Sequence, residues 1–213
     1  MGNEIPDGNL FMMCSVLNPD AVAALPDRYH VRTCRRSELS LWNAMPFDDP
    51  KVGMEQQAYM SRYFHDVYAE RESLFFEKCL FVCDDNDIPV GTCFTWKVYE
   101  KISTIHWYKV LKDYEGKGIG RALLSVVMND LSADDYPVYL HTQPSSFRAI
   151  KLYSDFGFAF LTDRVIGNRK NDLDACLPIL KVHMPKAEYG KLRFAKAPED
   201  FLEAVKSSDI DQF

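Results

Sequence analysis

The chain has 213 residues, of which 47% are hydrophobic and 26% charged, as in an ordinary globular protein. Its net charge of −6 offers no basic surface for nucleic acid or an anionic membrane. No run of about 18 apolar residues predicts a membrane-spanning helix, and residues 1–17 lack the basic start of a signal peptide. We therefore expect a cytoplasmic protein without a nucleic-acid or membrane partner, whose six cysteines are reduced core residues.

The N-terminal part of the chain predicts an irregular segment followed by a strand and two helices. Prolines interrupt residues 1–28 and predict that this segment is irregular. The alternation of side chains over residues 29–34 predicts a strand. Apolar side chains at helical spacing then predict a short helix over residues 37–44 and a longer helix over residues 56–71.

A meander of three strands is predicted next. Two apolar runs, residues 74–83 and 90–98, flank the polar residues 84–87, whose Asp and Asn side chains are typical of a hairpin turn. This acidic segment lacks the glycine and the final glutamate of an EF-hand loop. We therefore interpret it as a turn and not as a calcium site. Residues 104–111 complete the meander as its third strand.

The remaining chain predicts alternating helices and strands. Helices are expected over residues 119–131, 145–156 and 198–207, and strands over residues 137–142, 158–162 and 177–183. Residues 163–174 are polar and predict a loop. We expect one domain at residues 29–184, between an irregular extension of residues 1–28 and a C-terminal extension of residues 185–213 that contains the last helix.

The most informative segment is Glu115-Gly116-Lys117-Gly118-Ile119-Gly120, between a predicted strand and a predicted helix. Its alternating glycines leave the backbone N–H groups of the first helical turn unobstructed, and such groups bind phosphate oxygens. A P-loop would have Ser or Thr in place of Gly118, and a Rossmann fingerprint would have glycine in place of Arg121. The spacing predicts a phosphate-bearing ligand and excludes both motifs. A glycine-rich turn without a ligand is the alternative.

Two segments resemble motifs of one known family. Residues 110–124 resemble motif A of the GNAT N-acetyltransferase superfamily, and residues 149–158 resemble its motif B, in the family's order and at a similar separation. The resemblance covers roughly residues 29–184. It implies an α/β (α+β) fold with a central, mixed, mostly antiparallel sheet of six to seven strands flanked by helices. In that fold a splayed strand pair, here residues 104–111 and 137–142, holds acetyl-CoA.

The resemblance implies an acyl-CoA-dependent N-acyltransferase. The chain would transfer an acetyl group from acetyl-CoA to a primary amine by direct attack in a ternary complex. Its partner would be a small-molecule or peptide amine, with no metal, and a homodimer is left open. A non-catalytic acyl-CoA-binding sensor or scaffold is the alternative function, and a nucleotide-binding module is a third.

The resemblance assigns cofactor binding to motif A and to one residue before motif B. These residues are Val110, Leu111, Glu115, Gly116, Lys117, Gly118, Ile119, Gly120, Arg121, Ala122 and Ser146. Backbone groups near Val110 would pair with pantetheine, and a main-chain N–H there would stabilise an oxyanion. Glu115 replaces the family's usual Arg or Gln, so its carboxylate should point to solvent, while Lys117 and Arg121 add positive charge. Ser146 replaces a cofactor-contacting Asn, although capping of the next helix explains it equally well.

Tyr153 and His106 are the predicted catalytic residues. Tyr153 matches the tyrosine that often protonates the leaving thiolate in the family, and packing in the core is the alternative. On the third meander strand, Thr104, His106 and Tyr108 share one face by the period of two. His106 is expected to take the proton of the amine because imidazole titrates near neutrality. A histidine hydrogen-bonded within the sheet is an equal alternative, and His141 is a weaker candidate for the base.

Overall fold

A computed structural model describes residues 5–208 and 210–213 of the chain. The chain forms two compact units. The first comprises Met1–Ala21, Lys97–Thr104 and Ser132–Phe213, and the second comprises Val22–Trp96 and Ile105–Leu131. Strands β4 (Pro89–Val98) and β5 (Ile102–Val110) each contribute residues to both units. None of the described helices is long and apolar enough to cross a membrane.

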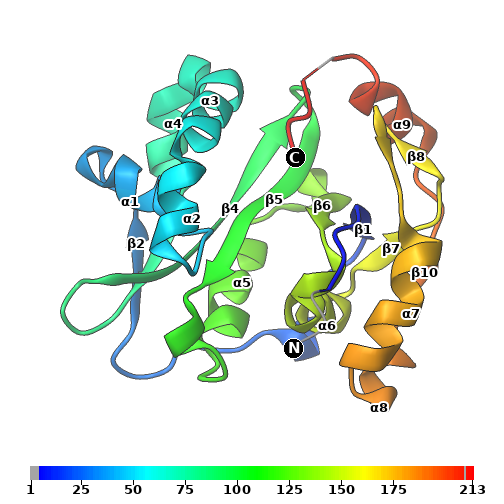
Figure 1. Cartoon of the computed structure of the whole chain (residues 1–213), viewed down its shortest axis with the longest axis horizontal. Coiled ribbons are helices and arrows are strands. Elements are labelled where there is room, and N and C mark those ends of the chain that lie inside the picture. The colour runs from blue at the N-terminus through cyan, green and yellow to red at the C-terminus, as the bar shows by residue number, and fades with distance from the viewer. Residues whose placement is uncertain (1–4, 209) are drawn as a thin grey trace. The chain divides into compact units, whose positions relative to one another are not determined.

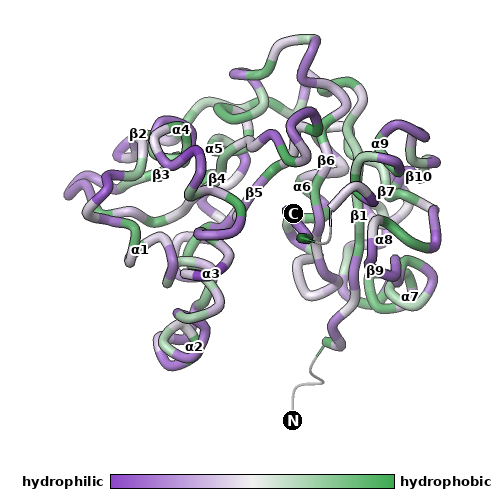
Figure 2. The backbone as a smooth tube through the Cα atoms, turned by 90° about the horizontal axis from the view of Figure 1, so that it is seen from above, coloured by the Kyte–Doolittle hydropathy of each residue, from purple (hydrophilic) through white to green (hydrophobic). Residues whose placement is uncertain are grey.

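The sheet of the first unit has the strand order β10-β7-β1-β6-β5. Strand β1 (Leu10–Cys14) is antiparallel to both of its neighbours, β6 (Val138–Thr142) and β7 (Ala159–Leu161). Strand β10 (Phe194–Ala195) is parallel to β7, and β6 is parallel to β5 at Ser103 and Thr104. Figure 2 shows β1 and β7 side by side in this unit, as the residue pairing requires.

Helices and a short hairpin complete the first unit (Figure 1). They are η1 (Pro19–Ala21), η5 (Ala133–Asp135), η6 (Pro144–Ser146), α6 (Phe147–Phe156), the hairpin of β8 (Val165–Ile166) and β9 (Arg169–Lys170), α7 (Leu173–His183), α8 (Lys186–Tyr189) and α9 (Glu199–Val205). Helix α9 packs on the sheet through Phe201, whose ring stacks on Tyr139 of β6 with 3.9 Å between the centroids. Both side chains are buried, so this helix covers apolar sheet surface.

The second unit has the strand order β5-β4-β3-β2. Strand β3 (Leu80–Cys83) is antiparallel to β2 (His30–Thr33) and to β4. Its helical segments are η2 (Arg36–Glu38), α1 (Leu39–Ala44), α2 (Pro50–Glu55), α3 (Gln57–Val67), η3 (Ala69–Arg71), α4 (Glu72–Lys78), η4 (Lys112–Tyr114) and α5 (Ile119–Asn129). In Figure 1, helices α1 to α4 form one blue-to-cyan group within this unit.

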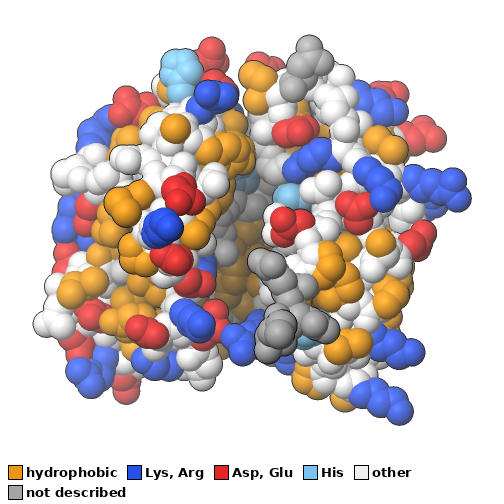
Figure 3. Space-filling view, in the orientation of Figure 1, with side chains coloured by type: hydrophobic (Ala, Val, Ile, Leu, Met, Phe, Trp, Pro, Cys, Tyr) orange, Lys and Arg blue, Asp and Glu red, His pale blue; other side chains and the backbone are white. Residues whose placement is uncertain are grey.

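A cluster of aromatic side chains forms the core beneath α1 to α4. Trp42, Tyr68, Phe75 and Phe94 are at most 1% exposed. Trp42 lies edge-on to Phe75 at 5.0 Å between ring centroids, and Tyr68 lies 4.9 Å from Phe75. Aromatic pairs at these separations stabilise beyond the area that they bury. On the face that Figure 3 shows, apolar and charged side chains are intermixed, which is ordinary for a protein surface.

Most of the predicted elements are confirmed. The strands predicted over residues 29–34, 90–98, 104–111, 137–142 and 158–162 are β2, β4, β5, β6 and β7. The helices predicted over residues 37–44, 56–71, 119–131, 145–156 and 198–207 contain α1, α3, α5, α6 and α9. The turn after β3 is also confirmed, because Asp84 Oδ1 accepts the backbone N–H groups of Asn86 and Ile88. All six cysteines are free thiols and buried, as expected.

The prediction that residues 1–28 are irregular is wrong at β1. The five residues of β1 are all buried, and the strand lies between β6 and β7 in the sheet. Its sequence is apolar throughout, so it lacks the alternation by which a half-buried strand is recognised. Residues 1–4 of the expected extension lie outside the described residues.

Two apolar runs that predict strands are helical in the structure. Residues 74–78 belong to α4, and only the end of that run forms β3. Residues 177–183 belong to α7, which buries Leu173, Cys176 and Leu180 at helical spacing. A short apolar run does not distinguish a buried strand from a buried helix. The expected loop of residues 163–174 contains the β8–β9 hairpin and the start of α7.

Candidate functional site

The glycine loop, residues 115–120, joins β5 to α5 in the second unit. Gly116 and Gly118 have φ angles of 75° and 82°, a backbone conformation that favours glycine. Gly118 is also the N-terminal cap of α5. A Cβ atom at Gly116 would meet no atom of the described residues within 4 Å. The backbone is therefore open to a ligand at this point of the loop.

The first turn of α5 supplies hydrogen-bond donors beside this opening. Ala122 N donates to Gly118 O at 3.1 Å, so the N–H groups of Ile119, Gly120 and Arg121 precede the first intrahelical hydrogen bond of this kind. Ile119 and Ala122 are fully buried and anchor the turn on the core. Exposed N–H groups at the positive end of a helix dipole bind phosphate oxygens. This eleven-residue helix and the open loop before it therefore form a candidate site for a phosphate group.

Two charged side chains of the loop are exposed. Glu115 is exposed, and the direction of its carboxylate relative to a bound phosphate stays a prediction. Lys117 is also exposed, and its ammonium group lies 4.7 Å from the centroid of the Tyr114 ring. Val110 and Leu111, which precede the loop, are half-buried, and Leu111 N donates to Val90 O at 2.8 Å. Their contact with pantetheine stays a prediction.

The predicted alternation of Thr104, His106 and Tyr108 is wrong beyond His106. Trp107 has a φ of 51°, which interrupts the regular pleat of β5. As a result, the consecutive side chains of His106 and Trp107 both reach Tyr68. Tyr108 instead lies against the first turn of α5, where its hydroxyl oxygen would be 2.2 Å from a Cβ added to Gly120.

His106 is buried within the second unit. Its side chain is 3% exposed, and its Nδ1 lies 2.5 Å from Tyr68 Oη. Trp107 Nε1 donates to the same oxygen at 3.0 Å. Burial lowers the pKa of His106 to about 3, so the ring is neutral at physiological pH. The structure shows the hydrogen-bonded histidine of the alternative interpretation, and the role as a base stays a prediction.

Tyr153 and Ser146 lie in the first unit, on α6 and at its start. Tyr153 is 5% exposed, and its ring centroid is 5.7 Å from that of Phe158. Ser146 is exposed and makes no side-chain capping hydrogen bond to α6, so capping does not explain this serine. The weaker candidate, His141, is hydrogen-bonded through Nε2 to Asn9 Oδ1 at 3.0 Å. Burial, together with nearby Arg169, lowers the pKa of His141 to about 3.

Comparison with known proteins identifies the family to which the chain belongs. A model of the acetyltransferase (GNAT) family matches residues 41–158, which is more than half of the chain. The chain belongs to the GNAT acetyltransferase family. Membership of this family indicates an acyltransferase. A search of curated proteins finds no match.

Solved structures of other GNAT proteins share the fold. An acetyltransferase of the GNAT family from Colwellia psychrerythraea is 10% identical, with a TM-score of 0.51 over 73% of this chain and 53% of its own. A tandem GNAT protein from the clavulanic acid biosynthesis pathway is 13% identical, with a TM-score of 0.51 over 73% of this chain and 50% of its own. The chain spans 43–60% of the length of the first solved structures that it resembles. The mixed α/β architecture with a central, mostly antiparallel sheet is therefore the GNAT fold.

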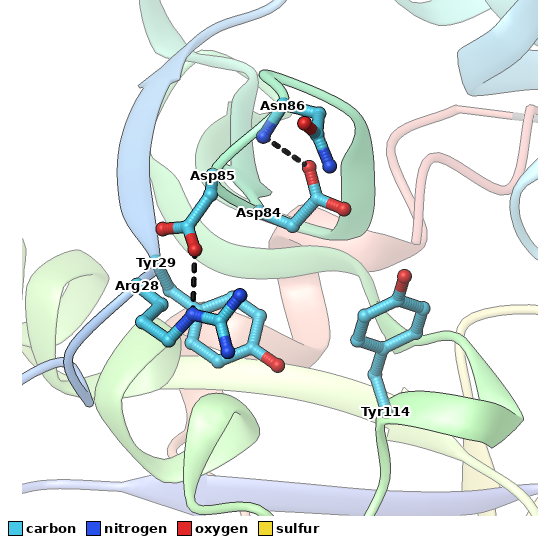
Figure 4. Close-up of a pocket in the computed structure, with 6 residues that line it drawn as sticks. All are labelled: Arg28, Tyr29, Asp84, Asp85, Asn86 and Tyr114. Atoms are coloured by element: carbon cyan, nitrogen blue, oxygen red, sulfur yellow. Dashed lines mark hydrogen bonds and ion pairs between the residues drawn. The ribbon is translucent and has the colours of Figure 1, made fainter.

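A small pocket lies beside the glycine loop in the second unit (Figure 4). Its volume is about 230 Å³, and its lining residues are Arg28, Tyr29, Asp84, Asp85, Asn86 and Tyr114. The Arg28 guanidinium donates to Asp85 at 2.6 Å across one side of the pocket. The rings of Tyr29 and Tyr114 lie 6.4 Å apart and edge-to-face. The pocket shares Tyr114 with the segment that leads into the loop, and its wall is a set of ion-paired and aromatic side chains.

The structure also brings together three metal-ligating side chains that sequence reasoning missed. His30, Cys83 and Asp87 place one ligand atom each within 4.8 Å of one another. The pairing register of β2 and β3 would have predicted this group, because His30 and Cys83 are direct cross-strand partners. The Asp87 carboxylate is bound by Arg32 Nε at 2.7 Å and by Arg35 at 2.7 Å. We interpret this group as an ion-pair network, because both carboxylate oxygens already have cationic partners.

This network predicts a pH-dependent contribution to stability from Asp87. Hydrogen bonds from Arg32, then Arg35 and His30, hold the pKa of Asp87 well below its usual range. A carboxylate with a lowered folded pKa stabilises the fold above its unfolded pKa of about 3.9, and this contribution is lost as the pH falls through the folded pKa. We expect Asp87→Asn to lower the urea midpoint at pH 7, and to lower it by a clearly smaller amount near pH 2, below the unfolded pKa.

The matched control is Asp66→Asn on the exposed surface of α3, which should change neither midpoint. Urea unfolding followed by circular dichroism at both pH values measures the difference. An equal loss of stability by Asp87→Asn at both pH values would contradict the role of its charge.

Proposed function

We propose that this GNAT protein is an N-acetyltransferase that transfers an acetyl group from acetyl-CoA to a primary amine. The observation that carries the proposal is the open backbone at Gly116, directly before the N-terminus of α5 and within the family match. When bound, acetyl-CoA supplies an acetyl group activated as a thioester, which an unprotonated amine attacks directly.

The chain's own residues hold the cofactor through its phosphates. The N–H groups of the first turn of α5 would bind phosphate oxygens, and so would those of the glycine loop, where φ is positive at Gly116 and Gly118. The positive charges of Lys117 and Arg121 lie in the same segment and favour an anionic ligand. Binding that rests on main-chain donors tolerates the exposed carboxylate of Glu115.

Two side chains move protons in this proposal. The Tyr153 hydroxyl donates a proton to the thiolate as CoA leaves as a neutral thiol, and the phenolate formed regains a proton from solvent before the next turnover. Nε2 of His106 takes the proton that the amine loses. This nitrogen is buried and has no hydrogen-bond partner among the described residues. The other ring nitrogen is held by Tyr68.

The cofactor assignment is tested by two substitutions at Gly116. Both Asp and Asn tolerate the positive φ of this residue better than other side chains do. A carboxylate there would repel the phosphates, so we expect Gly116→Asp to weaken CoA binding by about tenfold, with Gly116→Asn as the neutral control of the same shape. Isothermal titration calorimetry with CoA measures both. Equal affinities of the two variants would contradict a phosphate site at this loop.

Activity is tested by turnover of acetyl-CoA with a panel of small amines, polyamines, aminoglycosides and peptides with free N-termini. We expect CoA release that depends on one class of amine. Clear CoA binding without turnover of any amine would favour the alternative, a non-catalytic acyl-CoA sensor or scaffold. Stronger binding of ATP or NAD than of CoA would favour a nucleotide-binding module.

A further inference from the structure

A hydrogen-bonded network connects His106 to the surface of the second unit. Tyr68 Oη lies 2.5 Å from His106 Nδ1 and accepts a hydrogen bond from Trp107 Nε1 at 3.0 Å. The hydroxyl of Tyr63 is hydrogen-bonded to the same Tyr68 hydroxyl. Tyr68 is fully buried, whereas Tyr63 on α3 is half-buried. One phenol oxygen therefore meets three neighbouring polar groups.

The donors and acceptors of this network indicate where its protons lie. An indole N–H only donates, so Tyr68 Oη is an acceptor toward Trp107. With Nδ1–H of His106 donating to Tyr68 and the Tyr68 hydroxyl donating to Tyr63, every buried N–H and O–H of the network has an acceptor. Nε2 of His106 then carries a lone pair.

The opposite arrangement is less favourable. If the Tyr68 hydroxyl donated to Nδ1, the ring proton would lie on Nε2, where no acceptor is found among the described residues. A buried N–H without an acceptor is rarer in proteins than an unused acceptor lone pair. The network therefore favours the tautomer that is protonated on Nδ1.

We propose that Tyr68 is a positioning residue for His106, whose Nδ1–H it holds so that Nε2 is the nitrogen that takes a proton from the amine. This inference rests on the proposed function. The amine N–H bond breaks and the Nε2–H bond forms, and the proton leaves Nε2 for solvent after the amide product has left. Tyr63 acts through Tyr68, because a phenol that donates its own proton becomes a better acceptor.

The arrangement explains why Nε2 of this buried histidine has no partner among the residues that the structure describes. Burial alone disfavours the imidazolium, so the transient charge needs an acceptor on the far side of the ring. Tyr68 supplies this acceptor, in the way that a third group orients the base in other nucleophile–base sites. The rings of Phe94 and Tyr68 also lie 5.7 Å and 5.8 Å from the His106 ring, which fixes its plane.

The first test is the ring tautomer of His106 in the whole protein, which does not depend on turnover. Nitrogen-15 NMR of histidine-labelled protein resolves the five histidines, and His106→Gln assigns the signal. We expect a protonated Nδ1 and an unprotonated Nε2 in the wild type, and loss of this single tautomer in Tyr68→Phe. A wild-type ring protonated on Nε2 would overturn the inference, whether or not the protein transfers acetyl groups.

The second test is kinetic and uses the amine that the turnover panel identifies. We expect Tyr68→Phe to lower kcat about tenfold with an unchanged KM for acetyl-CoA, and Tyr63→Phe to lower kcat by a smaller factor. The double variant should equal Tyr68→Phe alone, because Tyr63 acts only through Tyr68. Tyr59→Phe, at an exposed position of the same helix, is the matched control and should not change kcat.

Additive losses in the double variant would overturn the inference, and so would a Tyr68→Phe variant with wild-type kcat. Removal of the buried Tyr68 hydroxyl deprives Trp107 and His106 of their partner, so the thermal unfolding midpoint of each variant is measured beside its kinetics. Tyr63→Phe is expected to fold normally because the Tyr63 side chain is half-buried, so its kinetics can be interpreted without a loss of stability. Absence of turnover in the wild type would count against the proposed function alone. The tautomer of His106 measured by NMR would then test the role of Tyr68 by itself.

Discussion

Substitution of Gly120 by alanine is expected to destabilise the protein by about 1–3 kcal/mol and to weaken CoA binding. The added Cβ would lie 2.2 Å from Tyr108 Oη, and real Cβ atoms do not approach other atoms so closely. Tyr108 is half-buried, so relief of this contact requires its ring or the helical turn to shift. The strain falls on the first turn of α5, which carries the N–H groups proposed to bind phosphate.

A second substitution, at Tyr108, tests whether its hydroxyl causes the strain in Gly120→Ala. Tyr108→Phe removes the clashing hydroxyl, and the nearest remaining atoms, Cζ of the ring and Cγ2 of Val110, lie at 3.4 Å and 3.5 Å from the added Cβ. We expect Gly120→Ala/Tyr108→Phe to regain most of the lost stability and CoA affinity, with a coupling energy of about 1–2 kcal/mol between the sites. Urea unfolding and calorimetric CoA titration of the four proteins measure the cycle.

The control for general effects of a helical alanine is Gly53→Ala in α2. There an added Cβ would meet its nearest neighbour, Phe47 Cβ, at 3.8 Å, which is ordinary contact. This variant should be at least as stable as the wild type, because alanine costs less conformational entropy than glycine in a helix. A Gly120→Ala protein that is as stable as Gly53→Ala would refute the predicted clash.

The glycine loop could be predicted from the sequence because its determinants are local. Gly116 and Gly118 adopt positive φ values in the loop itself, and the apolar spacing of Ile119 and Leu123 predicts the helix that follows. The hairpin turn after β3 is likewise made by Asp84 and its own neighbours. Such elements depend on few residues, all close together in the chain.

The surroundings of His106 could not be predicted in the same way. Its partner Tyr68 lies 38 positions earlier in the chain, and the strand period that placed His106 with Tyr108 fails because Trp107 takes a positive φ. The sequence does not predict this positive φ, because the residue at position 107 is tryptophan, which adopts such a conformation rarely. Strand β1 shows the same limit, because its partners β6 and β7 follow it by more than 100 residues. Non-local pairing, and not local propensity, decides these features.

Tyr153→Phe is expected to lower kcat by about a hundredfold while CoA affinity and the fold are retained. Phenylalanine keeps the buried ring, its contact with Phe158 and the backbone hydrogen bond from Phe158 N to residue 153, at 3.0 Å in the wild type. What is lost is the hydroxyl that protonates the departing thiolate. Because a thiolate of pKa about 8.5 is itself a fair leaving group, the loss should be large but incomplete.

The matched control is Tyr139→Phe on β6, a tyrosine of the same unit that is also buried and whose ring stacks on Phe201. It should retain wild-type kcat, because its hydroxyl has no part in the proposed chemistry. Steady-state kinetics of both variants with acetyl-CoA and the identified amine give kcat and KM, and titration with CoA gives the affinity. A kcat for Tyr153→Phe within about twofold of the wild type would remove Tyr153 as the acid, since a positioned proton donor contributes at least a hundredfold. Buried packing against Phe158 would then be the whole role of this side chain, and the thiolate would leave without protein assistance.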